Sequence, residues 1–328
     1  MKITPSRIAV IAMMFAVFTL LATGLASAEG VPPQCPSTIT ACGCTIGAHG
    51  NYILGSNLYA YQGLTLTNSC IDIDQLHVNL NLNGYDIFGP GNTGDCQDTE
   101  QPFHRQALGP LSPSNLGVGI HVMPGAENVE ITGGLGDEGG NYICGWNYGL
   151  ESEGTNVSVG SIFAGDDNVG FLFNNATDNT CNFCDAEFDI TGLQISGGSG
   201  NAVTASASGI NTQYGFWIDG SKHNQFTSNY SFVNGIAGYY VGCSSTGNVK
   251  PLIPCTEGTN TGNSLIFNDS NQNGRYGIAV ERQSFWNSFS QNATEMDGTK
   301  DIIDGDGNCV YNSYQGDDYG TKSPSCIQ

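Results

Sequence analysis

An internal repeat of about 23 residues constrains the fold of this chain more than any other feature. Each copy has the pattern Asn-x-apolar-x-x-Asn, as in Asn224, Phe226 and Asn229. The first residues of the four copies are Asn224, Asn263, Asn287 and Asn312. In the last copy Asp317 replaces the second asparagine. The first asparagines are 39, 24 and 25 residues apart, so one interval is longer than the period.

A second motif repeats in step with the first: a glycine followed by alternating apolar and variable residues. It begins at Gly119, Gly149, Gly170, Gly215, Gly238 and Gly277. This period of two is typical of a short strand with one buried face. The side chains predicted to point inward are Phe216, Ile218, Tyr239, Val241, Ile278 and Val280. Those predicted to point outward are Trp217, Asp219, Tyr240, Gly242, Ala279 and Glu281. Between residues 180 and 210 the register stays open, because the segment 190–195 fits either motif.

A repeat unit this short cannot bury its own apolar face, so successive units must stack on one another. The chain holds 46 Gly and 32 Asn. Asparagine tolerates the left-handed backbone conformation of tight corners, and stacked asparagine side chains can hydrogen-bond to one another as ladders. These properties predict an all-β solenoid of parallel strands.

The chain resembles the right-handed parallel β-helix proteins of the pectin-lyase-like superfamily over roughly residues 50–320. The resemblance is carried by the stretch from Val78 to Gly89, by the repeated Asn and Gly positions, and by the segment Asp301–Cys309 followed by Cys326. It implies a right-handed parallel β-helix, with any active site in a groove along one outer face. The sequence lacks the Asp-Pro-His-Glu segment of alginate epimerases and the Asn-Thr-Asp, Gly-His-Gly and Arg-Ile-Lys set of polygalacturonases.

The predicted organisation is one domain with caps at both ends. Residues 1–28 are expected to be a secretory signal peptide, with the cleavage motif Ala26-Ser27-Ala28. Residues 29–50 are expected to form an N-terminal cap, and residues 51–328 the β-helix with a C-terminal cap. The β-helix is expected to contain a long loop at 90–116 and an inserted loop of about 15 residues at 243–258, which accounts for the long repeat interval. No second apolar stretch is long enough to span a membrane.

The 12 cysteines all follow the predicted signal peptide, so they would lie in an oxidising compartment, where disulfides are favoured over metal-binding thiolates. The expected local pairs are Cys243 with Cys255 and Cys309 with Cys326. Cys181-Asn-Phe-Cys184 is a CxxC motif without a second such pair, and this also favours a disulfide over zinc. The full connectivity stays open.

The charge of the chain restricts its partners. Nine Lys+Arg oppose 30 Asp+Glu, which gives a formal charge of -21. Removing the signal peptide with Lys2 and Arg7 leaves seven basic residues against 30 acidic ones, or -23. This sign excludes nucleic acid as a partner. It would also repel an acidic polysaccharide unless calcium bridged the two.

The outward residues include candidates for polysaccharide binding. Trp217 and Tyr240 are successive outward residues and would give an aromatic strip on which a sugar ring can lie. The alternative is that both rings cover loops or contact each other. Arg275 and Arg282 flank one predicted strand and are candidates for contacting substrate.

Asp219 and Glu281 are the candidate catalytic residues. The predicted register places them two rungs apart with Gly242 between them, at roughly 9–10 Å. Two carboxylates at about this distance can serve as the acid and the base of an inverting glycosidase. The alternative is a solvated acidic face that keeps the protein soluble.

Calcium is the one candidate cofactor. Asp304, Asp306 and Asn308 alternate like the start of a calcium loop, whereas the alternative is an ordinary turn rich in Asp and Asn. The histidines His49, His77, His104 and His121 are dispersed and form no H-x-x-H motif, so no histidine metal site is expected.

The sequence therefore predicts a secreted, disulfide-capped β-helix that contacts extended polysaccharide or the cell envelope as a binding or structural element. The alternative function is a polysaccharide-active enzyme, such as a glycoside hydrolase, lyase or epimerase, working in an outer groove. The sequence does not decide between them, and it leaves the oligomeric state open.

Overall fold

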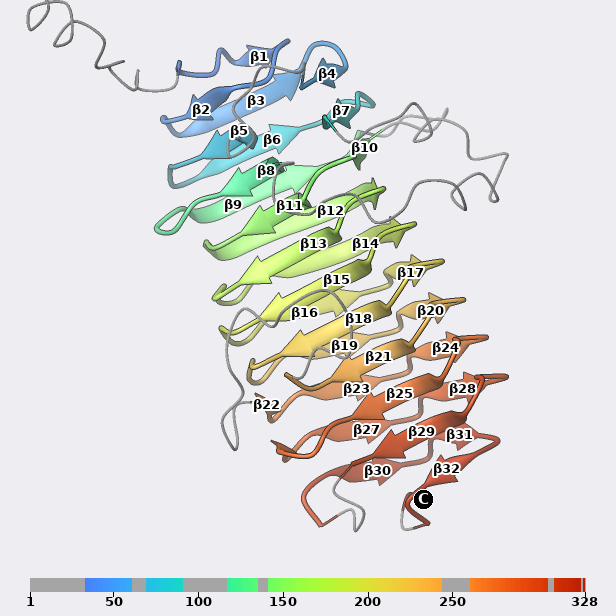
Figure 1. Cartoon of the computed structure of the whole chain (residues 1–328). Helices are drawn as coiled ribbons and strands as arrows, with labels where there is room; N and C mark the ends of the chain where they lie inside the picture. The colour runs from blue at the N-terminus through green and yellow to red at the C-terminus, as the bar shows by residue number, and fades with distance from the viewer. Residues whose placement is uncertain are drawn as a thin grey trace, which may run out of the picture. The chain divides into compact units, whose positions relative to one another are not determined.

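A computed structural model describes residues 33–60, 69–90, 117–134, 141–243, 260–305, 310–325 and 327. The chain divides into two units, Met1–Pro33 and Gln34–Gln328, and all of the described strands lie in the second. The second unit is a stack of parallel strands, whose successive rungs run from blue to red in Figure 1. The predicted signal peptide and nearly all of both expected loops, at 90–116 and 243–258, lie outside the described residues.

One face of the stack is an 11-stranded parallel sheet, here called the first face. Its strands are β2 (Cys44–Ile46), β5 (Ser69–Ile73), β8 (Val118–Val122), β11 (Tyr148–Ser152), β13 (Val169–Asn174), β15 (Thr191–Ser196), β18 (Tyr214–Asp219), β21 (Ala237–Val241), β25 (Tyr276–Val280), β29 (Lys300–Asp304) and β32 (Lys322–Ser323). The segment 190–195, whose register the sequence left open, belongs to this sheet, because Leu193 pairs with Phe216.

The remaining strands form a 19-stranded sheet and a 2-stranded one. The second face contains β1 (Thr38–Ile39), β3 (Gly50–Leu54), β6 (Val78–Asn81), β9 (Glu127–Thr132), β16 (Ala202–Thr204), β19 (Gln225–Thr227), β23 (Ser264–Ile266), β27 (Ser288–Ser290) and β30 (Ser313–Gln315). The third face contains β4 (Leu58–Tyr59), β7 (Ile87–Phe88), β10 (Tyr142–Cys144), β17 (Ala207–Gly209), β20 (Tyr230–Phe232), β24 (Asp269–Asn271), β28 (Ala293–Glu295) and β31 (Asp318–Tyr319). The long strands β12 (Thr155–Gly165) and β14 (Thr180–Glu187) contribute to both faces, and β22 (Asn260–Thr261) pairs with β26 (Ser284–Phe285).

The second and third faces meet at a corner made by one residue with left-handed backbone geometry. In β12 this residue is Ser161, with φ of 55°; the residues before it pair with β9, and those after it pair with β10. The same corner in later rungs is made by Phe183, Ala205, Ser228 and Phe267, all with positive φ. Each of these residues directly precedes a buried position, so the corner turns the chain while the next side chain points inward.

Asparagine ladders run through the corners and join the rungs. The side chain of Asn224 donates to Oδ1 of Asn263 at 2.9 Å, and the backbone N–H of Asn224 donates to the same oxygen at 3.0 Å. Asn263 donates in the same way to Asn287, and Asn287 donates to Asn312. A second ladder contains Asn229, Asn268, Asn292 and Asp317. The predicted ladders are therefore confirmed.

The interior of the stack is apolar, and the residues predicted to point inward belong to it. Phe216, Ile218, Tyr239, Val241, Ile278 and Val280 all belong to the main core cluster. Their side chains stack from rung to rung, and the rings of Phe216 and Tyr239 lie 4.9 Å apart. Across the 39-residue interval β21 and β25 pair directly and Asn224 contacts Asn263, whereas the inserted loop itself stays a prediction.

The repeated glycines are required because a third ladder lies behind them. Asn211 donates to Asn234, and Asn234 donates to Asn273. A Cβ added at Gly215 would lie 2.8 Å from Nδ2 of Asn234 and 2.7 Å from the carbonyl oxygen of Gly238, and it would collide with Oγ of Ser231. Any side chain at this position would displace the ladder.

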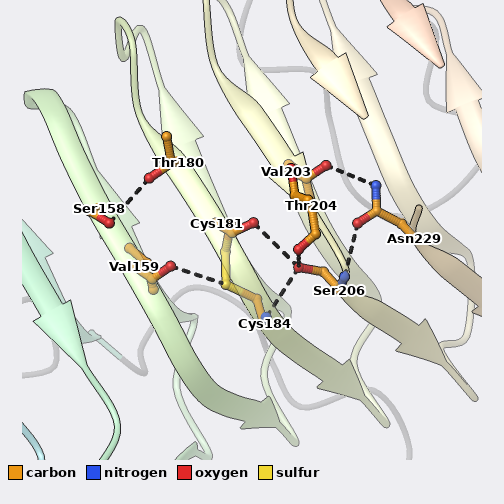
Figure 2. The surroundings of a disulfide bond; sticks show 9 residues. All are labelled: Ser158, Val159, Thr180, Cys181, Cys184, Val203, Thr204, Ser206 and Asn229. Carbon is orange, nitrogen blue, oxygen red and sulfur yellow. Dashed lines mark hydrogen bonds between the residues drawn. A yellow bond between two sulfur atoms is a disulfide. The ribbon is translucent and has the colours of Figure 1, made fainter. Parts of the chain in front are cut away.

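Three disulfides join described residues: Cys35–Cys44, Cys42–Cys70 and Cys181–Cys184. The first two tie down the N-terminal strands. The third confirms the disulfide expected from the CxxC motif (Figure 2). Cys243 is disulfide-bonded, and its expected partner Cys255 lies outside the described residues, as do both Cys309 and Cys326.

The Cys181–Cys184 disulfide lies where a ladder ends. Ser206 donates its backbone N–H to Oδ1 of Asn229 at 2.9 Å. The backbone N–H of Cys184 in turn donates to Oγ of Ser206 at 3.1 Å, as Figure 2 shows. Cys184 thus occupies the position that asparagine occupies in later rungs. Its buried side chain forms a disulfide there, where asparagine would form a hydrogen bond.

Gly215→Ala is expected to lower the free energy of unfolding by about 1–3 kcal/mol, because the new methyl group would overlap the ladder. The matched control is Gly160→Ala, since the atom nearest to an added Cβ at Gly160 is the carbonyl oxygen of Asn182, at 3.5 Å. Urea unfolding followed by circular dichroism measures the free energy of unfolding of both variants. Equal losses of stability in the two variants would contradict the role of the ladder.

Candidate functional site

The predicted aromatic strip lies on the outer side of the first face but is not open to solvent. Trp217 and Tyr240 are paired in register, as predicted. Their side chains are 0% and 5% exposed, respectively. The ring of Tyr240 stacks on that of Tyr214 at 4.5 Å. The ring of Trp217 contacts that of Tyr240 edge-on, and its indole N–H donates to the carbonyl oxygen of Gly242. The two rings belong to a second apolar cluster, and their role in binding stays a prediction.

The two predicted catalytic carboxylates follow the expected register but differ in exposure. The backbone N–H of Gly242 donates to Ile218, and that of Glu281 donates to Val241, so Gly242 lies between the rungs of Asp219 and Glu281. The side chain of Glu281 lies over Gly242. Asp219 is 0% exposed and accepts hydrogen bonds from Gln194 at 3.2 Å and from Ser196 at 3.0 Å. Its catalytic role stays a prediction.

The other predicted site residues do not come together. Arg275 and Arg282 are exposed at opposite ends of β25, which separates them by roughly 20 Å along the strand. Asp304 points into the stack, where its carboxylate accepts hydrogen bonds from Asn312 at 3.1 Å and from Tyr314 at 2.9 Å. The other two predicted calcium ligands, Asp306 and Asn308, lie outside the described residues, so calcium stays a prediction. Within the described ranges, no group of three or more His, Cys, Asp or Glu side chains could hold a metal ion.

One cluster of ionisable groups on the first face was not predicted. It consists of Asp72, His121, Glu151, Glu153 and Asn174, here called the His121 cluster. His121 pairs with Asp72 and Glu151 on the neighbouring strands. Its Nε2 lies 3.1 Å from the Glu153 carboxylate, and its Nδ1 lies 3.5 Å from that of Asp72. The amide of Asn174 donates to both Glu151 and Glu153.

The electrostatics of the His121 cluster follow from these contacts. Burial by itself would lower the pKa of His121, but hydrogen bonds to Asp72 and Glu153 raise it to about 9. Burial raises the pKa of Glu151, against the charge of His121. The repeated glycines contained the signal for this cluster, because aligning Gly119 with Gly149 places His121 beside Glu151. A search for histidine motifs along the chain misses such neighbours.

The third face carries two adjacent outward rows in which aromatic rings lie on either side of two carboxylates. We call Tyr142, Phe163, Asp185, Glu187, Tyr230 and Phe232 the aromatic–carboxylate strip. Tyr142 pairs with Phe163, and Phe163 pairs with Asp185. Asp185 then pairs with Ala207, and Ala207 pairs with Tyr230. Successive members of this row are about 4.8 Å apart.

Glycines in the adjacent row make room for the rings. Gly165, Glu187, Gly209 and Phe232 pair in this order on successive strands. A Cβ at Gly165 would lie 2.8 Å from the ring of Phe163, and one at Gly209 would collide with the ring of Phe232. The two rings therefore occupy the space above the glycines on either side of Glu187.

The neighbouring rings exclude water from the two carboxylates of the strip. Burial raises the pKa of Asp185 to about 6, although a backbone hydrogen bond with Ala186 opposes the shift. Burial, together with the charge of Asp185, raises the pKa of Glu187 to about 7. Burial also raises the pKa of Tyr142, and the charges of Asp86, Asp185 and Glu187 add to this shift. The glycine and asparagine repeats lie on other parts of the rung, so they contain no signal for the strip.

Comparison with known proteins identifies the fold and no closer relationship. No protein-family model matches the sequence, and no curated protein matches it. Among solved structures, the chain is similar to the tailspike protein of Dettilon, with 11% identity and a TM-score of 0.50, over 84% of this chain and 59% of that one. It is also similar to the enzymatically active domain of tailspike protein 2 of bacteriophage CBA120, with 13% identity and a TM-score of 0.54, over 88% of this chain and 41% of that one.

The chain thus spans about half the length of the tailspike chains it matches, and at this identity the likeness concerns the fold alone. The predicted fold is confirmed: the chain is a right-handed parallel β-helix. In the described part of the chain no helix is long and apolar enough to cross a membrane.

The His121 cluster is expected to make stability depend on pH. The pKa of His121 in the folded protein, about 9, exceeds its ordinary value of 6.5, so the stabilisation is complete below pH 6.5 and is lost as the pH rises through 9. Urea unfolding should show that His121→Gln loses about 2–3 kcal/mol less stability than the wild type over this interval. The exposed His223 provides the control variant His223→Gln. The same loss in wild type and His121→Gln would contradict the assignment.

Proposed function

We propose that this protein is a secreted polysaccharide-binding protein, and that its ligand lies along the aromatic–carboxylate strip. The observation that carries the proposal is the arrangement of the strip. Two aromatic pairs, Tyr142 with Phe163 and Tyr230 with Phe232, lie on either side of the two carboxylates. All of these groups stand on the outer side of consecutive rungs.

This arrangement provides both kinds of contact that sugars need. The apolar C–H face of a sugar ring packs on an aromatic ring, and carboxylates accept hydrogen bonds from hydroxyl groups. Tyr230 is 40% exposed and stacks on Phe232 at 5.1 Å, so this pair presents an open apolar surface beside the carboxylates. The regular spacing of the rungs suits a chain of repeated units lying along the stack.

The charges favour a neutral polysaccharide. The chain carries a formal charge of -21, and the strip itself contributes Asp185 and Glu187. Further along the same face stand Asp269 and Glu295. An acidic polysaccharide would be repelled by this surface.

The disulfides support an extracellular or periplasmic location. Cys35–Cys44, Cys42–Cys70 and Cys181–Cys184 would not persist in a reducing cytosol. Together with the predicted signal peptide, they are consistent with export. Extended polysaccharides of cell envelopes and matrices lie in the same compartments.

Retention on a panel of immobilised neutral polysaccharides, with polygalacturonate as the acidic comparison, tests the proposal. We expect Tyr230→Ala to weaken binding to the retained glycan about tenfold, because it removes one stacking surface, equivalent to about 1.4 kcal/mol. The control is Trp286→Ala, which removes a ring that is 68% exposed on a corner outside the strip. If no neutral glycan were retained, or if both variants bound equally well, the proposal would fail.

The alternative function is a polysaccharide-active enzyme. Its candidate pair from the sequence is Asp219 with Glu281. Because Asp219 is buried and already accepts hydrogen bonds from Gln194 and Ser196, the geometry favours another pair for acid–base chemistry on a bound glycan. An activity that survives both Asp219→Asn and Glu281→Gln would exclude the pair chosen from the sequence.

A further inference from the structure

We propose that the aromatic–carboxylate strip hydrolyses the glycosidic bonds of the polysaccharide it binds, with Glu187 as the proton donor and Asp185 as the base. This inference rests on the proposed function, because the substrate is the glycan held by the strip. It adds a reaction and assigns a role to each carboxylate.

The first argument is the position of the two carboxylates. Asp185 and Glu187 are separated on β14 only by Ala186, whose side chain is buried in the core. Both therefore point outward from the same face, with their Cα atoms about 6.6 Å apart along the strand. Glycoside hydrolases use two carboxyl groups on either side of the bond that is cleaved, and inverting enzymes leave room between them for a water molecule.

The second argument is the surroundings of Glu187. The ring of Phe163 lies over Gly165 on one side, and the ring of Phe232 lies over Gly209 on the other. A carboxyl group between apolar rings loses hydration, and this disfavours its ionised form. Glu187, whose pKa is about 7, therefore keeps its proton at nearly neutral pH and can give it to a leaving oxygen.

The third argument is the difference between the two groups. The backbone hydrogen bond with Ala186 favours the ionised form of Asp185, whose pKa of about 6 lies below that of Glu187. Oδ1 of Asp185 is buried and has no hydrogen-bond partner among the described residues. Such an oxygen would bind a water molecule or a hydroxyl group of the ligand. Between pH 6 and 7 the pair therefore holds one proton on Glu187 and one negative charge on Asp185.

The reaction balances with water as the second substrate. Glu187 donates its proton to the glycosidic oxygen as the bond from that oxygen to the anomeric carbon breaks. A water molecule bonds to the anomeric carbon, and the Asp185 carboxylate takes one of its protons. The products are a new reducing end and a new alcohol. Return of one proton from Asp185 to Glu187 through solvent restores the starting state.

The test uses the mature protein and the neutral polysaccharides retained in the binding experiment, each first reduced with borohydride so that new reducing ends can be measured. We expect reducing ends to appear, with a rate that is highest between pH 6 and 7. The rate should fall above pH 7 as Glu187 loses its proton, and below pH 6 as Asp185 gains one.

Glu187→Gln and Asp185→Asn are each expected to lower kcat by about 100-fold or more. The amide oxygens still accept hydrogen bonds from sugar hydroxyl groups and the aromatic rings are unchanged, so glycan retention should stay within about twofold. Glu187→Gln should also abolish the fall in rate above pH 7, which a merely structural role would leave in place. The matched control is Glu295→Gln, which changes an exposed carboxylate in the same row as Glu187 but outside the strip. Its rate should equal that of the wild type.

The outcomes separate this inference from the proposed function. Retention of a glycan without any new reducing ends would overturn hydrolysis and leave binding intact. New reducing ends at unchanged rates in Glu187→Gln and Asp185→Asn would overturn the assignment of the two residues. If no glycan were retained and no product formed, both the binding function and the hydrolysis would be overturned.

Discussion

The buried hydrogen bonds of the asparagine ladders hold this structure together. At each corner an amide side chain accepts hydrogen bonds from the backbone N–H and the side chain of the preceding rung, as Asn268 does from Asn229. The same amide donates to a backbone carbonyl, as Asn268 does to Phe226. Buried polar groups are costly unless they are satisfied, and here each one satisfies the next. In the rungs that carry ladders, the register of the strands between the corners follows from these contacts.

The ladders also determine where chemistry can occur. Because the corners fix which residues point inward, side chains two positions apart on a strand emerge on the same outer face, in adjacent rows. Carboxylates and rings that are about 22 residues apart in the sequence, such as Phe163 and Asp185, become direct neighbours. The His121 cluster and the aromatic–carboxylate strip arise in this way on two different faces, although the local sequence around either one is unremarkable. A solenoid can therefore acquire a site by single substitutions at matching positions of consecutive rungs.

Much of the fold could be predicted from the sequence, because the repeat reports backbone geometry directly. The glycine and asparagine periods gave the rungs, the ladders, and the inward positions such as Phe216 and Tyr239. The site was harder to predict. The outward direction of Trp217 followed from the period, but its burial depends on neighbours across rungs, such as Tyr214 and Tyr240. Glu187 was missed because its environment is made by rings on other strands, and no local pattern records them.

The ladders have a direction, and each of the three ends in a carboxylate. Asn292 donates to Asp317, Asn273 donates to Asp297, and Asn312 donates to Asp304. An amide receives a hydrogen bond and passes one on, whereas an ionised carboxylate only receives. When ionised, each of these three carboxylates therefore ends a run of side-chain hydrogen bonds. Asp167 and Asp189, earlier in the chain, also hold ladder positions, and there the ladder continues through their backbone N–H groups, so a carboxylate can end the side-chain hydrogen bonds without ending the stack.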